Sequence, residues 1–216
     1  MIFKMLKMIK LIGVLLALIV SSLGSSNAQK STTRVKVVYK WVINGEERDR
    51  GGKNTLIAAS GSSKSFTDMS GINLIPETPK EVSYIDYLSK KTFQAADLSD
   101  GSKVYTETDF AEYPEIIETD EVEKILNYNC KKVKTVLRSN NIEIWYTTEI
   151  DAKGTPIMNY GIPDGLVLKV VRNGNNVLIA SEIEVINEKK SEKIIPEYLG
   201  KKVDAPLYRH LLTGSF

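Results

Sequence analysis

Cysteine and histidine are nearly absent from this sequence of 216 residues, which contains one of each. A single cysteine, Cys130, excludes an intrachain disulfide, so the fold depends on packing and hydrogen bonds. Cysteine is among the most buried residue types, and we interpret Cys130 as a small core residue. Zinc sites need several Cys or His ligands, so that kind of metal site is excluded. His210 lies in an irregular segment near the end of the sequence, which argues against Ser-His-Asp or Cys-His catalysis.

Nucleotide-binding motifs and a large excess of either charge are also lacking. Neither GxxxxGK[ST] nor GxGxxG after a strand occurs, and Gly51-Gly52 in a charged turn marks only a chain reversal. The formal net charge is +2, and it becomes −1 when the three lysines within residues 1–28 are left out. Binding to phosphate backbones needs a clear basic excess. We therefore expect no cofactor, no metal and no nucleic-acid partner.

The first 28 residues have the pattern of an export signal. Lys4, Lys7 and Lys10 give a positive start, residues 11–23 are apolar, and Ser26-Asn27-Ala28 is a small-x-small cleavage site. The apolar run is shorter than the ~20 residues of a membrane-spanning helix. We predict a cleaved signal, an exported protein that is periplasmic or secreted, and no stable membrane span after cleavage.

Alternating polar and apolar residues predict short β-strands in most of the remaining sequence. The clearest of these segments are 34–43, 82–88, 92–98, 103–110, 131–138, 142–148, 166–172 and 177–186. Polar turns rich in Asn, Gly and Ser join several of them, as is typical of antiparallel hairpins. About nine or ten such strands form a twisted sheet that closes or curls. We predict an all-β fold, a curved antiparallel sheet in the form of a bowl or half-barrel, with one short helix at 120–128.

The sequence divides into three predicted parts. Residues 1–28 are the signal peptide, residues 29–186 the β-bowl domain, and residues 187–216 a charged linker or tail. The last part contains Pro196 and Pro206 and has no sustained period. A length of 188 residues after cleavage suits a single domain.

One long connection, 149–165, is rich in Gly and Pro, and loops of this length are more often functional or packed than idle. Aromatic residues near it and elsewhere (Tyr84, Tyr87, Trp145, Tyr146 and Tyr160) have the chemistry to stack on sugar rings, although such residues more often belong to the core. We name Trp145, Tyr146, Tyr160 and Asp164 as candidate substrate-binding residues.

Three acids, Asp86, Glu143 and Glu149, are the first candidates for the paired carboxylates of glycoside chemistry. Acids that alternate with apolar residues on strands usually mark a solvated face, and Glu143 lies between Ile142 and Ile144. We therefore predict no catalytic residue.

Two segments carry a resemblance to a known family. ETDEVEKILNYNCKKVKTVLRSNNIEIWYT together with YGIPDGLVLKVVRNGN is similar to the second half of the N-terminal bowl-like domain of bacterial peptide-N-glycosidase F (type II) enzymes. The resemblance covers about residues 33–186. It implies a non-catalytic domain that helps to present glycoprotein substrate, while the amidase chemistry belongs to downstream jelly-roll domains for which 216 residues leave no room.

The same region resembles, more remotely, the GLPGLI family of exported bacterial proteins, which has no assigned activity. In YGIPDGLVLK, Ile162 stands for the Leu of the signature, and Asp164 is inserted between Pro163 and Gly165.

Three functions follow as hypotheses. In the first, the protein is an accessory binding domain for glycoprotein or glycopeptide, with a downstream catalytic domain as partner if the sequence is a fragment, and it is not an enzyme on its own. In the second, it is a stand-alone GLPGLI-like carrier with an apolar ligand in a concave face lined by Val, Ile and Leu. In the third, it is an enzyme with two converging acids in a cleft.

Overall fold

The computed structural model describes residues 33–68, 79–186 and 193–213. The predicted signal peptide, residues 1–28, lies outside these residues. The described residues belong to one compact unit. None of their helices is long and apolar enough to cross a membrane.

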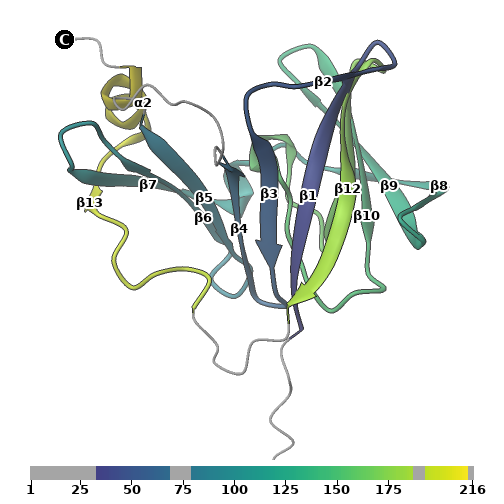
Figure 1. Ribbon diagram of the computed structural model, residues 1–216, viewed down its shortest axis with the longest axis horizontal. Coiled ribbons are helices and arrows are strands. Elements are labelled where there is room, and N and C mark those ends of the chain that lie inside the picture. The colour runs from purple at the N-terminus through teal and green to yellow at the C-terminus, as the bar shows by residue number, and fades with distance from the viewer. Residues whose placement is uncertain (1–32, 69–78, 187–192, 214–216) are drawn as a thin grey trace, which may run out of the picture. The chain divides into compact units, whose positions relative to one another are not determined.

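In the described part of the chain, thirteen strands form one sheet (Figure 1). The strands are β1 Arg34–Ile43, β2 Glu46–Arg48, β3 Lys53–Ala58, β4 Ser62–Asp68, β5 Lys80–Asp86, β6 Lys91–Asp97, β7 Lys103–Asp109, β8 Ile117–Ile125, β9 Tyr128–Leu137, β10 Asn140–Thr147, β11 Leu166–Arg172, β12 Asn176–Ile186 and β13 Lys201–Lys202. Two short 3-10 helices, η1 Phe110–Glu112 and η2 Met158–Tyr160, and one α-helix, α2 Ala205–Thr213, complete the described elements.

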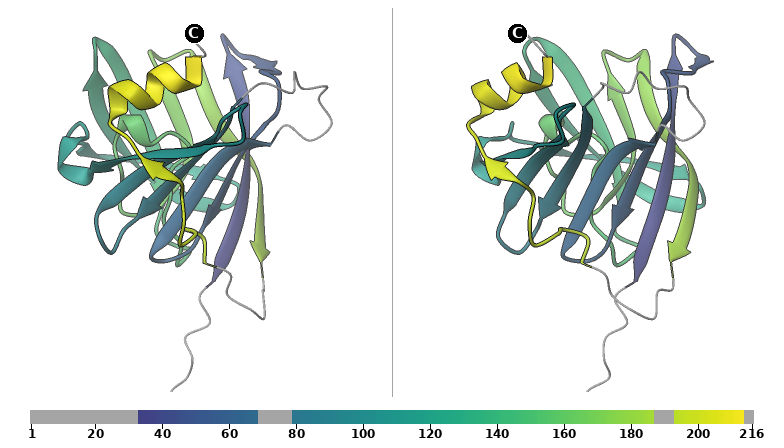
Figure 2. Two further views of the ribbon diagram at one scale, coloured as in Figure 1. Left: turned by 90° about the vertical axis from the view of Figure 1, so that its left-hand side faces the viewer. Right: turned by 60° about the vertical axis from the view of Figure 1, so that its left-hand side comes forward.

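The strand order is β13-β7-β6-β5-β4-β3-β1-β12-β11-β10-β9-β8, and β2 pairs with β1. Every pairing is antiparallel except that of β13 with β7. The sheet is open and curved, as Figure 2 shows, so the predicted all-β class and curved antiparallel architecture are confirmed. The strand number exceeds nine or ten partly because β2 and β13 are pieces of three and two residues.

Asparagines at the hairpin ends join neighbouring turns to one another. Asn44 and Asn173 adopt positive φ, as the Asn-Gly pairs predict. Asn175 Nδ2 donates to Asn44 Oδ1 at 2.9 Å, and Asn173 Nδ2 donates to Asn140 Oδ1 at 2.9 Å. Side chains therefore fix the relative positions of three turns at one end of the sheet.

One face of the sheet, here the inner face, carries most of the hydrophobic core. Its fully buried members include Val37, Leu56, Ile144 and Leu168. The Tyr39 hydroxyl donates to the Val167 carbonyl at 2.6 Å, so β11 reaches the inner side of β1 across the curl of the sheet. The curvature thus encloses the core between strands that are not neighbours.

The long loop, 149–165, packs against this inner face. The backbone of Lys153 forms an isolated β-bridge with Ala59, and the backbone of Gly154 forms another with Leu166. A Cβ on Gly154 would lie 2.9 Å from the Ser63 Cβ, so only glycine fits at this close approach. The loop is therefore a packed part of the core rather than an open binding loop.

The helix predicted at 120–128 is wrong, because this segment forms most of β8 and the turn into β9. Leu126 and Asn127 adopt positive φ, which closes a tight hairpin. Ile125 is buried whereas Val122 is exposed, as in a strand that covers a core with one end only. Pairing with β9 supplies the backbone hydrogen bonds that a short helix would have had to make alone.

The α-helix instead lies within 187–216, which was predicted as a linker or tail. Asp204 Oδ1 accepts a hydrogen bond from the Leu207 amide at 2.8 Å and so caps the start of α2. Pro206 sits in the first turn, where a helix tolerates proline. Tyr208 is 2% exposed and packs on Ala96 and Val104, so this segment covers β6 and β7.

Candidate functional site

Trp145, the first predicted binding residue, is a buried residue of β10. Its side chain shares a row with Lys132 of β9 and Lys169 of β11, which lie directly opposite it on either side. The two ammonium groups lie 5.0 Å and 5.3 Å from the centroid of the Trp145 ring. Trp145 is 7% exposed, and its indole N–H has no hydrogen-bond partner among the described residues.

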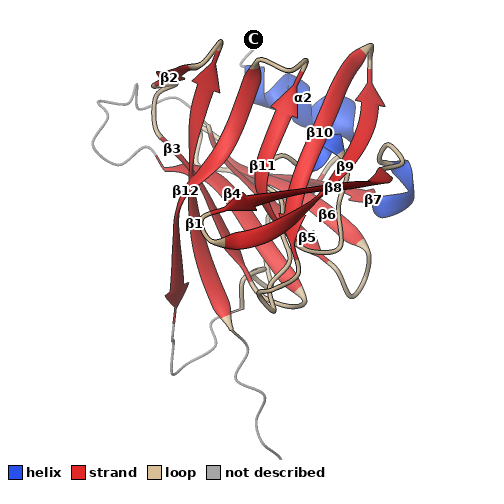
Figure 3. Cartoon of the chain, turned by 90° about the vertical axis from the view of Figure 1, so that its right-hand side faces the viewer, coloured by secondary structure: helices blue, strands red, loops and turns tan. Residues whose placement is uncertain are grey.

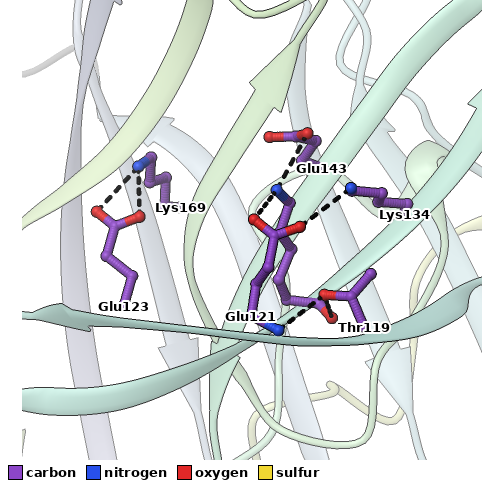
Figure 4. A network of polar contacts seen from close by, with 7 residues as sticks. Thr119, Glu121, Glu123, Lys134, Glu143 and Lys169 are labelled. Atoms are coloured by element: carbon purple, nitrogen blue, oxygen red, sulfur yellow. Dashed lines mark hydrogen bonds and ion pairs between the residues drawn. The ribbon is translucent and has the colours of Figure 1, made fainter.

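An ion-pair network joins β8 to β9, β10 and β11 (Figure 4). Lys132 Nζ lies 2.7 Å from Glu121 and 3.2 Å from Glu143, and Lys169 Nζ lies 2.7 Å from Glu123. Figure 3 shows the result, with β8 running across β10 and β11. Trp145 has no free ring face for a sugar in this arrangement.

The other predicted residues do not form one open surface with Trp145. Tyr146 is buried, and its hydroxyl lies 3.4 Å from Glu118; burial raises the pKa of Tyr146. Tyr160 is half-buried in η2 and packs against the core. Asp164 is exposed and pairs with Lys153.

The candidate acids are also occupied. Asp86 accepts hydrogen bonds from the Leu88 amide and the Ser89 hydroxyl, and Glu149 accepts one from Asn129. Glu143 pairs with Lys132. No two of these carboxylates converge on a shared contact, and no group of three metal-ligating side chains occurs among the described residues.

Two further residues behave as the sequence predicted. Cys130 is fully buried, and burial raises the pKa of its thiol to about 11, which keeps it neutral and unreactive. Tyr84 is also buried, but on the other face of the sheet, where it lies opposite Lys64.

The inner face divides into an apolar half and a polar half. In β1, β3 and β10–β12 it is mainly aliphatic, and loop 149–165 covers it. From the start of β3 across β4, β5 and β6 it also carries a row of polar side chains. We call the following residues the polar floor: Asn54, Ser65, Thr67, Glu81, Ser83 and Gln94.

The register of four strands produces the polar floor. Ser65 lies opposite Ser83, and Ser83 lies opposite Gln94, so these side chains form one row on the inner face. Ser65 also lies opposite Leu56, which identifies this face as the inner one. A hollow of about 210 Å³ lies over the row, and Pro156 of the long loop borders it.

One aromatic residue, Tyr208, contacts the polar floor, and another, Trp41, lies on the same face of the sheet in β1. The Tyr208 hydroxyl of α2 donates to Glu81 at 3.1 Å. Trp41, at the end of β1, is half-buried against the core and lies opposite Leu178 and Arg48. Trp41 is thus the tryptophan with accessible surface on the inner face.

Sequence reasoning missed the polar floor because its residues look like an ordinary solvated face. The sequence does contain one indication of it, which is alternation with aromatic residues. Phe66, Tyr84, Phe93 and Tyr105 alternate with the polar residues and lie on the other face of the same strands, so the polar residues share one face. Chemically, hydroxyl and amide groups can donate to and accept from sugar hydroxyls and peptide groups. They do not provide a nucleophile with an adjacent base.

Comparisons with known proteins give one family. The family model described as "N-glycanase peptide, N-terminal domain" matches residues 37–210. Two solved structures of PNGF-II, in C2 and P21 space groups, are each 28% identical to this chain and cover 85% of it, with TM-scores of 0.69 and 0.71. The chain covers 33% and 34% of those two structures, about a third of their length. A comparison with curated proteins gave no match. This chain belongs to the family of N-glycanase peptide N-terminal domains.

Proposed function

We propose that this chain is an exported, non-catalytic recognition domain that binds the glycan of a glycoprotein or glycopeptide on its polar floor. In this role it assists an N-glycan-releasing amidase of the peptide-N-glycosidase F type, as the family membership suggests. The floor residues offer several hydroxyl and amide groups within one row, and sugars bind through many such groups together.

One observation carries the proposal: the part of the inner face that neither the long loop nor α2 covers is polar. A polar concave surface suits a hydroxylated ligand, because each ligand hydroxyl that leaves water must regain a hydrogen bond. Half-burial of Ser65, Ser83 and Gln94 keeps their donors accessible while the neighbouring strands hold them in place.

The non-catalytic part of the proposal is supported by the occupied acids. Glu143 and Glu121 share Lys132, and Asp86 stabilises a turn. Their carboxylates therefore have structural partners rather than a cleft in which to converge.

The alternative, an apolar carrier, needs an open concave lining of Val, Ile and Leu. Among the described residues, the aliphatic side chains of the inner face in β1, β3 and β11, such as Val37, Leu56 and Leu168, are 0% exposed. Burial of these side chains supports a hydroxylated ligand over an apolar one on this face.

A titration tests the proposal directly. The chain is titrated to millimolar ligand with an N-glycosylated peptide and with the same peptide without its glycan, and binding is measured by calorimetry or NMR. We expect only the glycosylated peptide to bind. Gln94→Ala is expected to weaken binding about two- to tenfold, the effect of one hydrogen bond of ~0.5–1.5 kcal/mol.

The matched control is Lys64→Ala on the opposite face of the same sheet, since Lys64 lies opposite Tyr84. This variant is expected to bind as the wild type does. Absence of any binding at millimolar glycopeptide, together with unchanged activity of a family enzyme after deletion of this domain, refutes the proposal.

A further inference from the structure

An arginine lies over the accessible tryptophan at the edge of the inner face. The Arg50 guanidinium carbon is 4.6 Å from the centroid of the Trp41 ring. Trp41 is half-buried and Arg50 is exposed, so the indole is anchored in the core while the guanidinium faces solvent. Such a pair is a cation–π contact, which restrains the arginine more than solvent would.

A defined turn places Arg50 at this position. Asp49 Oδ1 accepts a hydrogen bond from the Gly51 amide at 2.8 Å. Gly51 and Gly52 adopt φ of 75° and 107°, a region that favours glycine. The Gly51-Gly52 pair therefore sets the path of the connection that carries Arg50, beyond marking a reversal.

The acids of this connection already have partners. Glu46 pairs with Arg48, and Glu47 pairs with Lys40 at 2.9 Å. Asp49 accepts from the Gly51 amide. Among the described residues, the guanidinium of Arg50 meets no carboxylate, so its charge is available to a ligand.

Arginine is suited to carboxylate recognition because its planar group donates two parallel hydrogen bonds. Contact with an aromatic ring uses the face of the guanidinium and leaves the N–H groups at its edge available. Trp41 lies on the same face as the polar floor, because its neighbour Tyr39 lies opposite Asn54. Arg50, which lies over the Trp41 ring, is therefore on the side of the sheet that carries the polar floor.

We propose that Arg50, positioned by Trp41, forms a subsite for a carboxylate-bearing sugar at the end of a glycan that lies on the polar floor. This inference rests on the proposed function and specifies the class of glycan. The floor supplies partners for neutral hydroxyls, and Arg50 adds a selective contact for an acidic terminal sugar.

Three matched ligands test the subsite: a peptide, the peptide with a neutral N-glycan, and the same glycopeptide with terminal sialic acid. We expect the sialylated ligand to bind the wild type about fivefold tighter than the neutral one, the size of one partly exposed ion pair. We expect Arg50→Gln to abolish this difference without weakening binding of the neutral glycopeptide. The difference should shrink as salt is raised, because exposed charges are screened.

Arg48→Gln is the matched control, since Arg48 lies opposite Trp41 but is already paired with Glu46. This variant should retain the preference for the sialylated ligand. Equal affinity of the wild type for the neutral and sialylated ligands overturns the subsite and leaves the proposed function intact. Failure of both glycopeptides to bind, or binding of the bare peptide with the same affinity, overturns both proposals.

Discussion

At the scale of residues, the two tryptophans have different environments. Trp145 is enclosed by Lys132, Lys169 and β8, whereas Trp41 keeps accessible surface beside Arg50. Both sit on strands with alternating polarity, so sequence pattern alone could not separate them. The sequence-based candidate, Trp145, is structural in this arrangement because Lys132 and Lys169 lie against its ring and are ion-paired to β8.

Replacing Trp145 tests its structural role. We expect Trp145→Ala to lower the free energy of unfolding by about 3–5 kcal/mol, as for other buried aromatic residues. Urea denaturation followed by far-UV circular dichroism measures the change. Trp41→Ala should cost clearly less stability, because Trp41 is only half-buried; an equal or smaller loss for Trp145 would contradict this assignment.

At the scale of elements, loop 149–165 is held in place by close backbone approaches. A Cβ on Gly165 would lie 2.5 Å from the Tyr146 ring and 2.7 Å from the Thr147 carbonyl. From its length and composition we predicted that this loop is either functional or packed. In the structure it is packed.

We therefore expect Gly165→Ala to lower the free energy of unfolding by about 1–3 kcal/mol, the usual cost of overpacking a core. Chemical denaturation measures it. Gly61→Ala is the matched control, because a Cβ there would meet Leu88 only at an ordinary 3.6 Å. Similar stability of the two variants would show that the loop is not seated as described.

The attachment of β8 depends on ionised acids and so on pH. Hydrogen bonds from Lys132 and then Lys134 hold the pKa of Glu121 below its ordinary value of 4.5. Because the folded-state pKa is depressed, the stabilisation from Glu121 is present above the unfolded pKa and is lost as pH falls through and below it. Acid should therefore loosen β8 from the sheet.

Quenching of Trp145 fluorescence by acrylamide measures this loosening. In a Trp41→Phe background Trp145 is the single tryptophan, and we expect weak quenching at neutral pH and stronger quenching as pH falls below about 4.5. Adding Glu121→Gln should raise quenching at neutral pH and flatten the pH profile. An unchanged profile in that variant would refute the role of Glu121.

At the scale of the whole molecule, the described residues fold as one unit that includes α2. Tyr208 covers Ala96 and Val104 and donates to Glu81, so the segment after 193 is joined to the sheet by packing as well as by β13. The charge and the two prolines of this segment predicted a linker. That pattern does not indicate the capped helix α2 or the burial of its aromatic residue Tyr208.

We expect Tyr208→Ala to lower the free energy of unfolding of the whole domain by about 2–4 kcal/mol, in the range for large-to-small core substitutions. Circular dichroism and tryptophan fluorescence should report the same midpoint if unfolding is two-state. His210→Ala, on an exposed position of α2, is the control that should leave the midpoint unchanged. A transition unaffected by Tyr208→Ala would mean that the tail does not contribute to the domain.

The sequence by itself determined the all-β class, the hairpins and the burial of Cys130, because alternation and Asn-Gly turns act between neighbours in the chain. Only the tertiary structure decided which aromatic residues are accessible, where the helix lies and which polar residues share the floor. These depend on the register between strands and on the curl that brings distant strands together, and neither is encoded within one strand. Ser83 and Gln94 alternate with apolar residues along their strands. This pattern is the same whether the polar face of the sheet meets bulk water or lines a concave floor.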